Sequence, residues 1–460
     1  MQLPFVGPAY TLATRQASAQ DSVNLYLQGL ETPSKAGFIL RAAPGLLLFA
    51  ALGGAIRGAL EVGSRAFVVA GNGLYEVYTS GTSTLRGTLN TSTGNVGMVW
   101  GTTQLVVVDG AYGYVFRLAT NVFAQITDPD FSGSTMARYL DGFFIFQAPG
   151  TQKFMASAID DATALDALDF ASAESSPDSL VAHIVCNSRL YLPGALTTEV
   201  WFSSGGAFPF SRSNGETMDV GCIAPWSVVK ADAGFFFCGR DENGSGIVYQ
   251  VNGAAPKRIS NTPMEEALQG STDISKATAW CYQDHGQTFY VINAPGVPAT
   301  LVYEISTGAW HKRCELDASG YFAQGRVTHH MFAFGRHLVG DAIGNIYAMS
   351  RDYRTLSGDP LVCERTSPND VVPLRQRQFF REFVLDIETG ETDLASPFVE
   401  LSWSDDGGRQ FGNPVVRSCG TLGNRGVPLR WHRLGQARDR VWRTRFDARA
   451  ARVIISGASA

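Results

Sequence analysis

The sequence lacks the features that mark membrane, disulfide-rich and zinc-ribbon proteins. Its most apolar stretch, residues 45–56, contains a Gly-Gly pair and is too short to span a bilayer. The N-terminus MQLPFVGPAYT has neither the charged start nor the long apolar run of a signal peptide. The seven cysteines are odd in number and show no CxxC spacing, so we expect reduced, mostly buried thiols and folding in a cytoplasm. No membrane insertion is expected.

The motifs of common enzyme classes are also missing. There is no G-x-S-x-G elbow, no P-loop and no H-E-x-x-H. His329, His330 and His337 cluster, but a metal site would need an added carboxylate or cysteine beside them. The aspartates of residues 160–169 lack the glycine and glutamate of an EF-hand and are interpreted as a solvated helix face. We therefore predict no enzyme activity, catalytic residue, metal or cofactor.

Charge is scarce overall and uneven along the chain. The net charge of −5 gives no general attraction to nucleic acid or to an anionic membrane. Lysine is missing after about residue 352, whereas residues 425–452 hold nine arginines against only Asp439 and Asp447. This stretch is interpreted as an interface or a solvated strand face, with binding to phosphate or an acidic partner as the alternative.

What the sequence does contain is typical of an all-β protein. The 49 glycines and 28 phenylalanines indicate many tight turns between aromatic-rich strands. From about residue 54 a strand–turn–strand pattern recurs, first at residues 66–77 and, in its seventh copy, at residues 337–349. Its spacing of roughly 40–50 residues is that of one propeller blade, which predicts a β-propeller of six or seven blades. A stack of β-sandwiches is the main competing fold.

Three domains are expected. Residues 1–50 are turn-rich, with four prolines, and are predicted to be an extended N-terminal arm. Residues 51–352 form the propeller-like domain, and the alternating runs at 378–387 and 398–403 predict a β-sandwich-like domain at 353–460. A short helix is predicted at residues 160–170. A second is predicted to begin at Thr262, which has a capping-box spacing to Glu265, and to end at Gly270.

The most specific local motif is SDDGGRQF at residues 404–411, which matches an Asp-box turn at Ser404, Asp406, Gly408 and Phe411. A short aspartate accepts backbone N–H bonds in such a turn, glycine supplies the unusual dihedral angle, and the aromatic ring pins the turn to its sheet. The motif builds a hairpin and catalyses nothing. It occurs once and outside the repeats, which weakens a sialidase interpretation.

Three further stretches carry a resemblance to a known family. They are VNLY (23–26) with APGL (43–46), KRISN (257–261) before the helix at Glu265, and LSWSDDGG (401–408) with RWHRLGQARDRV (430–441). Together they resemble the packaged-DNA stabilisation, or tail nozzle (tail tube), proteins of short-tailed bacteriophages. Ala43 departs from this pattern, because the family often has threonine there.

The resemblance implies a virion structural protein made in the host cytoplasm and built into the bacteriophage tail. It implies a homo-hexamer, a ring that extends the portal–adaptor DNA channel, helps retain the packaged genome and conducts DNA on ejection. The implied partners are the adaptor ring, tail fibre or spike proteins and, transiently, DNA in the lumen. A mildly acidic chain suits such a lumen, since a basic one would grip phosphates. Arg438, Arg440 and Arg443 are the predicted subunit-interface residues.

Two other functions compete with this prediction. A receptor-binding or polysaccharide-cleaving tail propeller would need paired carboxylates or an arginine cluster at a propeller mouth. A cellular kelch- or WD-like scaffold would show stronger repeat signatures and lack the tail-like ends of this sequence.

Overall fold

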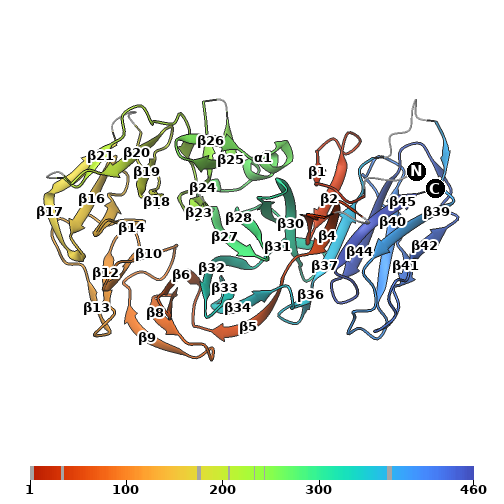
Figure 1. Ribbon diagram of the computed structural model, residues 1–460, viewed down its shortest axis with the longest axis horizontal. Coiled ribbons are helices and arrows are strands. Elements are labelled where there is room, and N and C mark those ends of the chain that lie inside the picture. The colour runs from red at the N-terminus through yellow and green to blue at the C-terminus, as the bar shows by residue number, and fades with distance from the viewer. Residues whose placement is uncertain are drawn as a thin grey trace.

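In the computed structural model, nearly all regular structure is β-strand, as the composition predicts (Figure 1). The structure describes residues 5–32, 36–173, 178–205, 208–232, 234–242, 244–369 and 376–459. Two bodies lie side by side in Figure 1, a β-propeller and a β-sandwich.

Within the described residues the propeller has seven blades, which settles the predicted choice of six or seven. Blade one is β6 (Ile56–Val62), β7 (Arg65–Ala70), β8 (Gly73–Val77) and β9 (Ser83–Thr88). Blade two is β10 (Gly97–Trp100), β11 (Gln104–Val108), β12 (Gly113–Arg117) and β13 (Val122–Gln125). Blade three is β14 (Ala137–Leu140), β15 (Phe143–Gln147), β16 (Lys153–Ala158) and β17 (Asp161–Ser172). Blade four is β18 (Ile184–Cys186), β19 (Arg189–Pro193), β20 (Thr198–Ser203) and β21 (Phe210–Arg212). Blade five is β22 (Gly221–Cys222), β23 (Val229–Ala231), β24 (Gly234–Arg240), β25 (Ser245–Asn252) and β26 (Ala255–Arg258), with η1 (Pro225–Ser227) between β22 and β23.

Blade six is β27 (Thr278–Asp284), β28 (Gln287–Asn293), β29 (Thr300–Glu304) and β30 (Ala309–Leu316), with β31 (Phe322–Gln324) paired to β30 and η2 (Ile274–Lys276) before it. Blade seven is β32 (Val327–Ala333), β33 (Arg336–Asp341), β34 (Asn345–Ser350) and β5 (Gly45–Ala51), followed by the short β35 (Thr355–Leu356) and β36 (Asp359–Pro360). Its outermost full strand, β5, therefore comes from the N-terminal part of the chain and pairs antiparallel with β34. The innermost strands follow one another around the axis, and β32 contacts β6 to close the ring.

The sandwich has two sheets. One is β2 (Ala19–Val23), β37 (Val362–Thr366), β44 (Val441–Asp447), β40 (Phe398–Ser404) and β41 (Val415–Ser418), and the other is β3 (Leu25–Gly29), β4 (Phe38–Ala42), β45 (Val453–Ser459), β39 (Glu382–Ile387) and β42 (Leu429–His432). β1 (Tyr10–Thr11) pairs with β2, and β38 (Gln378–Phe379) pairs with β43 (Gln436–Ala437).

Burial explains why the two bodies have different sequence patterns. A mid-blade strand such as β11 (QLVVV) is buried on both faces because a neighbouring blade covers each, so its apolar run is continuous. In the sandwich, β39 (EFVLDI) alternates half-buried and buried residues, since only one face meets the opposite sheet. The apolar runs of the repeats therefore indicate strands covered on both faces, and the alternating runs indicate strands covered on one face.

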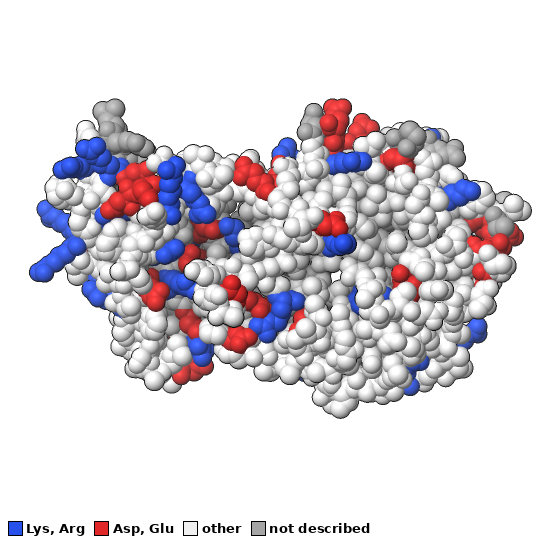
Figure 2. Space-filling view, turned by 180° about the vertical axis from the view of Figure 1, so that it is seen from behind, with Lys and Arg blue, Asp and Glu red and all other residues white. Residues whose placement is uncertain are grey.

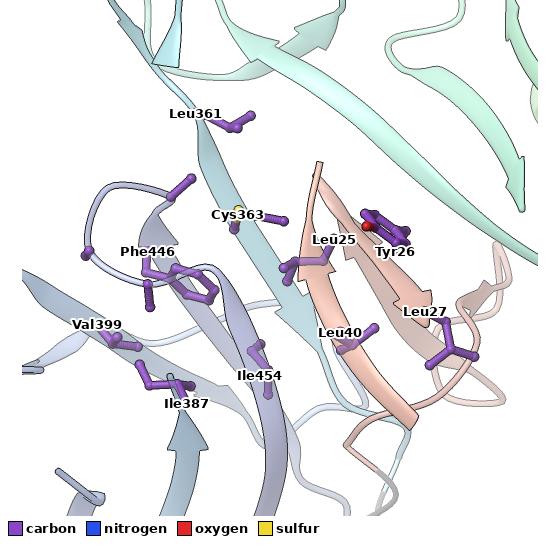
Figure 3. Packing of buried hydrophobic residues seen from close by; sticks show 14 of the residues in the cluster. Leu25, Tyr26, Leu27, Leu40, Leu361, Cys363, Ile387, Val399, Phe446 and Ile454 are labelled. Atoms are coloured by element: carbon purple, nitrogen blue, oxygen red, sulfur yellow. The ribbon is translucent and has the colours of Figure 1, made fainter. Parts of the chain in front are cut away.

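The segment predicted as an extended arm lies on its own chain as the strands β1–β4. β2 pairs in parallel with β30 of blade six and antiparallel with β37, so blade six and one sandwich sheet form a single sheet of eleven strands in the described residues. In Figure 3, Leu25 of β3 points toward the sandwich core while Tyr26 points toward the propeller. Tyr26 packs edge-on against Phe289 of β28, with ring centroids 5.2 Å apart.

Asn24, between β2 and β3, holds this junction together. It is 1% exposed and has a φ of 55°, a conformation that asparagine tolerates better than most residues. Its side-chain amide donates to the carbonyls of Cys314 (2.9 Å) and Val362 (2.7 Å) and accepts from the Cys314 N–H (2.9 Å). Its backbone N–H donates to the Lys312 carbonyl at 2.7 Å. One side chain thus joins blade six, the sandwich and the N-terminal turn.

One helix prediction is confirmed and the other is wrong. α1 (Thr262–Gln269) forms as predicted, although the N-cap is Asn261, whose side chain accepts from the Met264 N–H, and not Thr262. Residues 161–170 instead belong to strand β17, which pairs with β16 through a bulged register. The leucines and alanines there have near-helical spacing, but strand pairing along an open blade edge outweighs so weak a local preference. No helix of the described chain has the length and apolarity to cross a membrane.

The Asn24 junction gives a first prediction. Asn24→Asp keeps the positive φ accessible, but it replaces the NH₂ group of the amide with an oxygen. That oxygen cannot donate to the carbonyls of Cys314 and Val362, which it would face. We expect it to lower the free energy of unfolding by about 3 kcal/mol, through lost bonds and a buried charge. Urea denaturation followed by circular dichroism measures the change.

Asn121→Asp is the matched control. Asn121 also has a positive φ (57°), but it is exposed and its side-chain oxygen accepts from Arg65 at 2.6 Å, a bond that aspartate preserves. Its effect should stay within about 0.5 kcal/mol. Equal losses in the two variants would contradict the role assigned to the Asn24 amide.

Candidate functional site

The four residues of the Asp-box-like motif lie in one turn at the end of β40. The Ser404 hydroxyl accepts the Gly408 N–H at 2.9 Å, and Asp406 Oδ1 accepts the N–H groups of Arg409 (2.9 Å) and Gln410 (3.0 Å). Gly408 has a φ of 89°. Hydrogen bonds from the Ser404 hydroxyl and the Gln410 N–H lower the pKa of Asp406. The carboxylate is thereby committed to holding the turn.

Phe411 connects this turn to the predicted arginines. The Arg443 guanidinium lies 4.0 Å from the centroid of the Phe411 ring, and its Nε donates to Ser402 Oγ at 3.1 Å. Arg443 is half-buried in this position. A sequence motif and a predicted interface residue therefore belong to one local cluster of the sandwich.

Arg440 is buried inside the sandwich, with 2% of its surface exposed. It forms a bidentate ion pair with Asp405 (2.6 and 2.8 Å) and also donates to the Leu434 carbonyl at 2.6 Å. Its guanidinium lies over Phe380 at 4.6 Å and Trp442 at 5.1 Å. Arg440 is consequently unavailable to a neighbouring subunit, because its donors and its faces are occupied by its own chain.

The arginine-rich stretch is less basic at the surface than its sequence suggests. Besides Arg440, three of its arginines are paired with acids, namely Arg425 with Glu391 (3.6 Å), Arg430 with Glu382 (3.2 Å) and Arg449 with Asp447 (2.8 Å). Most of these acids lie outside residues 425–452, so the sequence alone did not reveal the pairing. Figure 2 shows basic and acidic side chains interspersed over the sandwich, while the propeller on the same face carries few charges.

Arg438 differs from these arginines because it is exposed and forms no ion pair with any described residue. It follows β43, which pairs with β38 so that Phe379 stands opposite Gln436. Ala437 is buried, so Phe379 and Gln436 share the outward face of this ribbon, and the exposed Arg438 follows in a bend. Phe379 is 70% exposed. We call these three residues the ribbon patch.

Sequence reasoning missed Phe379. The pair Phe379-Phe380 gave a signal, because successive strand residues face opposite ways and a Phe-Phe pair must place one ring outward. Phe380 is the inward one, at 3% exposure beneath Arg440. An exposed aromatic ring beside an unpaired arginine is the composition that protein interfaces favour.

The clustered histidines and the cysteines show no arrangement for metal chemistry. His330 Nε2 lies 3.0 Å from His337 Nδ1, but no group of three His, Cys, Asp or Glu among the described residues could hold a metal ion. The seven cysteines are free thiols, and six of them are buried. Burial raises the pKa of Cys222 to about 12, which keeps it protonated and unreactive at neutral pH.

Comparison with known families gives the identity of this architecture. Residues 1–354 match the family model described as "Bacteriophage P22 Gp10, beta-propeller", and residues 371–460 match "Bacteriophage P22 Gp10, beta-sandwich". The propeller and sandwich thus define a class, the structural proteins of bacteriophage tails. Within that class the chain belongs to the P22 Gp10 family of tail nozzle, or DNA stabilisation, proteins.

Solved structures resemble this chain only distantly. The WD40 domain of Neurospora crassa Pan2 is 7% identical over 68% of this chain and 97% of its own, with a TM-score of 0.45. The computationally designed Ika8 protein is 15% identical over 72% and 99%, with a TM-score of 0.40. The N-terminal domain of Nup159 is 10% identical over 75% and 97%, with a TM-score of 0.41. A search of curated proteins finds no match.

The contrast between Arg440 and Arg438 gives a second prediction. Arg440→Leu should lower the free energy of unfolding by about 2–3 kcal/mol, because it removes a buried ion pair whose acid, Asp405, stays partly solvated. Arg438→Leu, two residues away and exposed, should change it by less than about 0.5 kcal/mol. Thermal and urea denaturation of both variants measure the difference. A stable Arg440→Leu protein would show that the pair is dispensable.

Proposed function

We propose that the chain is a structural subunit of the phage tail nozzle. It forms a ring of six that extends the portal–adaptor DNA channel, helps retain the packaged genome and conducts DNA on ejection. It does this without catalysis. The observation that carries the proposal is the match of both bodies, over residues 1–354 and 371–460, to one family of tail proteins.

The construction of the chain supports a load-bearing role. A tail part must keep its shape while the genome is held and released. Here the joint between the two bodies is a continuous sheet through β30, β2 and β37, and a hydrophobic core shared by strands of both bodies lies beneath it. Bending this joint would break backbone hydrogen bonds and expose buried apolar surface. The two bodies are therefore expected to move as one.

The charge distribution supports a surface that DNA can pass. The net charge is −5, and four arginines of the basic stretch are paired with acids of the same chain. A lumen rich in unpaired cations would bind many phosphates and slow the genome. Arginines that are paired with acids of the same chain bind phosphate less readily and so avoid that effect.

The ribbon patch is the proposed contact with such a neighbour, either the next subunit or the adaptor ring. Phe379 supplies apolar area and Arg438 supplies a charge that its own chain does not satisfy. Arg440, which the sequence placed in the same role, instead keeps the scaffold beneath the patch in shape.

The proposed ring is tested by measuring the mass and symmetry of the purified chain, alone and with adaptor-ring proteins. Light scattering gives the mass and negative-stain imaging gives the symmetry. A six-fold ring with a central hole, formed alone or on the adaptor, supports the proposal. A monomer or trimer that ignores the adaptor overturns it, and release of sugar from host surface glycans would then favour a glycan-cleaving propeller.

A third prediction concerns the ribbon patch. The double variant Phe379→Ser/Arg438→Glu should stay folded, because both side chains are exposed, but should weaken ring or adaptor assembly at least ten-fold. Sedimentation against protein concentration measures this. Lys257→Glu, an exposed charge reversal on β26 of the propeller, is the control and should assemble normally. Unchanged assembly of the double variant would remove the patch from the interface.

A further inference from the structure

A cavity of about 180 Å³, partly open to solvent, lies at the axis of the propeller. Its walls come from β6, β10, β14, η1, β27 and β32, the inner elements of blades one, two, three, five, six and seven, which surround the axis in Figure 1. Asn95, Thr278 and Thr328 contribute polar side chains, and Trp226 and Trp280 contribute broad apolar faces. The cavity is therefore lined by polar and aromatic groups drawn from most of the ring.

A single formal charge lines this cavity, the guanidinium of Arg138 on β14. No Asp or Glu is among the described residues that line it. His329 and His330 also line it, but burial lowers their pKa values to about 4 and about 3, so both rings are neutral at pH 7. One positively charged side chain and no negatively charged side chain therefore line the cavity.

The Arg138 guanidinium has few hydrogen-bond partners, although it lies in the wall of this cavity. Its Nη1 donates to the neighbouring Ala137 carbonyl at 2.9 Å, and it forms no ion pair with a described residue. The nearby His183 is fully buried and is kept neutral by burial and by the charge of Arg138, which lower its pKa to about 3. Burial also lowers the pKa of Arg138, to about 10, which leaves it cationic at neutral pH.

Arg57, on β6 beside the same cavity, shows how this fold satisfies an arginine that serves only structure. Its donors reach the carbonyls of Gly71, Thr91, Thr93 and Gly94 and the Thr91 hydroxyl, at 2.5–2.9 Å. Five N–H donors thus meet five acceptors. Arg138 also has five N–H donors, but only the Ala137 carbonyl accepts from it. Its remaining N–H groups are therefore free to bind an anion that enters the cavity.

We propose that the propeller cavity binds one small oxyanion, a phosphate or a carboxylate, on the guanidinium of Arg138. The planar guanidinium offers parallel N–H groups that fit two oxygens of either anion. The Asn95 amide and the Thr278 hydroxyl provide further donors around the cavity. The size of the cavity limits the ligand to a small anion or to the end of one side chain. This inference rests on the cavity alone and does not depend on the nozzle proposal.

The test is titration of the purified full-length chain with inorganic phosphate and, separately, with acetate, at constant ionic strength set by chloride. Isothermal calorimetry gives the stoichiometry and affinity, and thermal unfolding gives an independent readout. We expect saturable binding of at least one of the two anions, with one site per chain. The pair of titrations shows whether the site prefers phosphate or a carboxylate.

Variants locate the site. Arg138→Gln should weaken binding at least ten-fold, whereas Arg138→Lys, which keeps the charge but not the fork, should lose less. Arg117→Gln, an exposed arginine on β12 of the same propeller, should bind like the unaltered chain. If Arg138→Gln does not fold, the lysine variant and the unaltered chain still decide the matter. Absence of saturable binding of both anions, unchanged affinity in Arg138→Gln, or an equal loss in Arg117→Gln would overturn the proposal.

Discussion

The buried amide of Asn24 is the constraint on which the arrangement of the whole chain depends. It bonds at once to the outer strand of blade six and to the first strand of the C-terminal sandwich, at a corner where the backbone needs a positive φ. Because of that corner, β2 and β3 can enter different sandwich sheets. The chain can then continue through β4 to β5 and close blade seven. The N-terminal strands are thus structural parts of both bodies.

This topology ties the stability of each body to the other. Blade seven of the propeller is completed by a strand from residues 45–51, and the sandwich needs residues 19–42 to complete both of its sheets. Neither body is therefore made from one continuous stretch of sequence. Such interlocking stabilises each body, since local opening of one body requires unpairing strands of the other.

Much of the fold could be predicted from the sequence, because its signals are local. Blade spacing, glycine turns and the position of α1 depend on residues close together in the chain, and the structure confirms the all-β propeller and sandwich. The strand at residues 161–172 could not be predicted from spacing, because its pairing with β16 decides its conformation. The role of residues 19–42 was hidden for a similar reason, since their partners lie about 300 residues away. Likewise, the sequence grouped Arg438 with Arg440, because the residues that bury Arg440, Asp405 and Phe380, are distant in the chain.

The same ion pair explains why two C-terminal motifs occur together. The stretch SWSDDGG supplies Asp405 and the stretch ARDRV supplies Arg440, and the two join neighbouring strands β40 and β44 beneath the Asp-box-like turn. An isolated guanidinium buried among Phe380, Trp403 and Trp442 would be costly, so the arginine requires the aspartate. The motif pair that made the sequence recognisable therefore specifies a fold. Arg438 and Phe379, in contrast, are exposed, and they are the residues proposed for contact with other tail proteins.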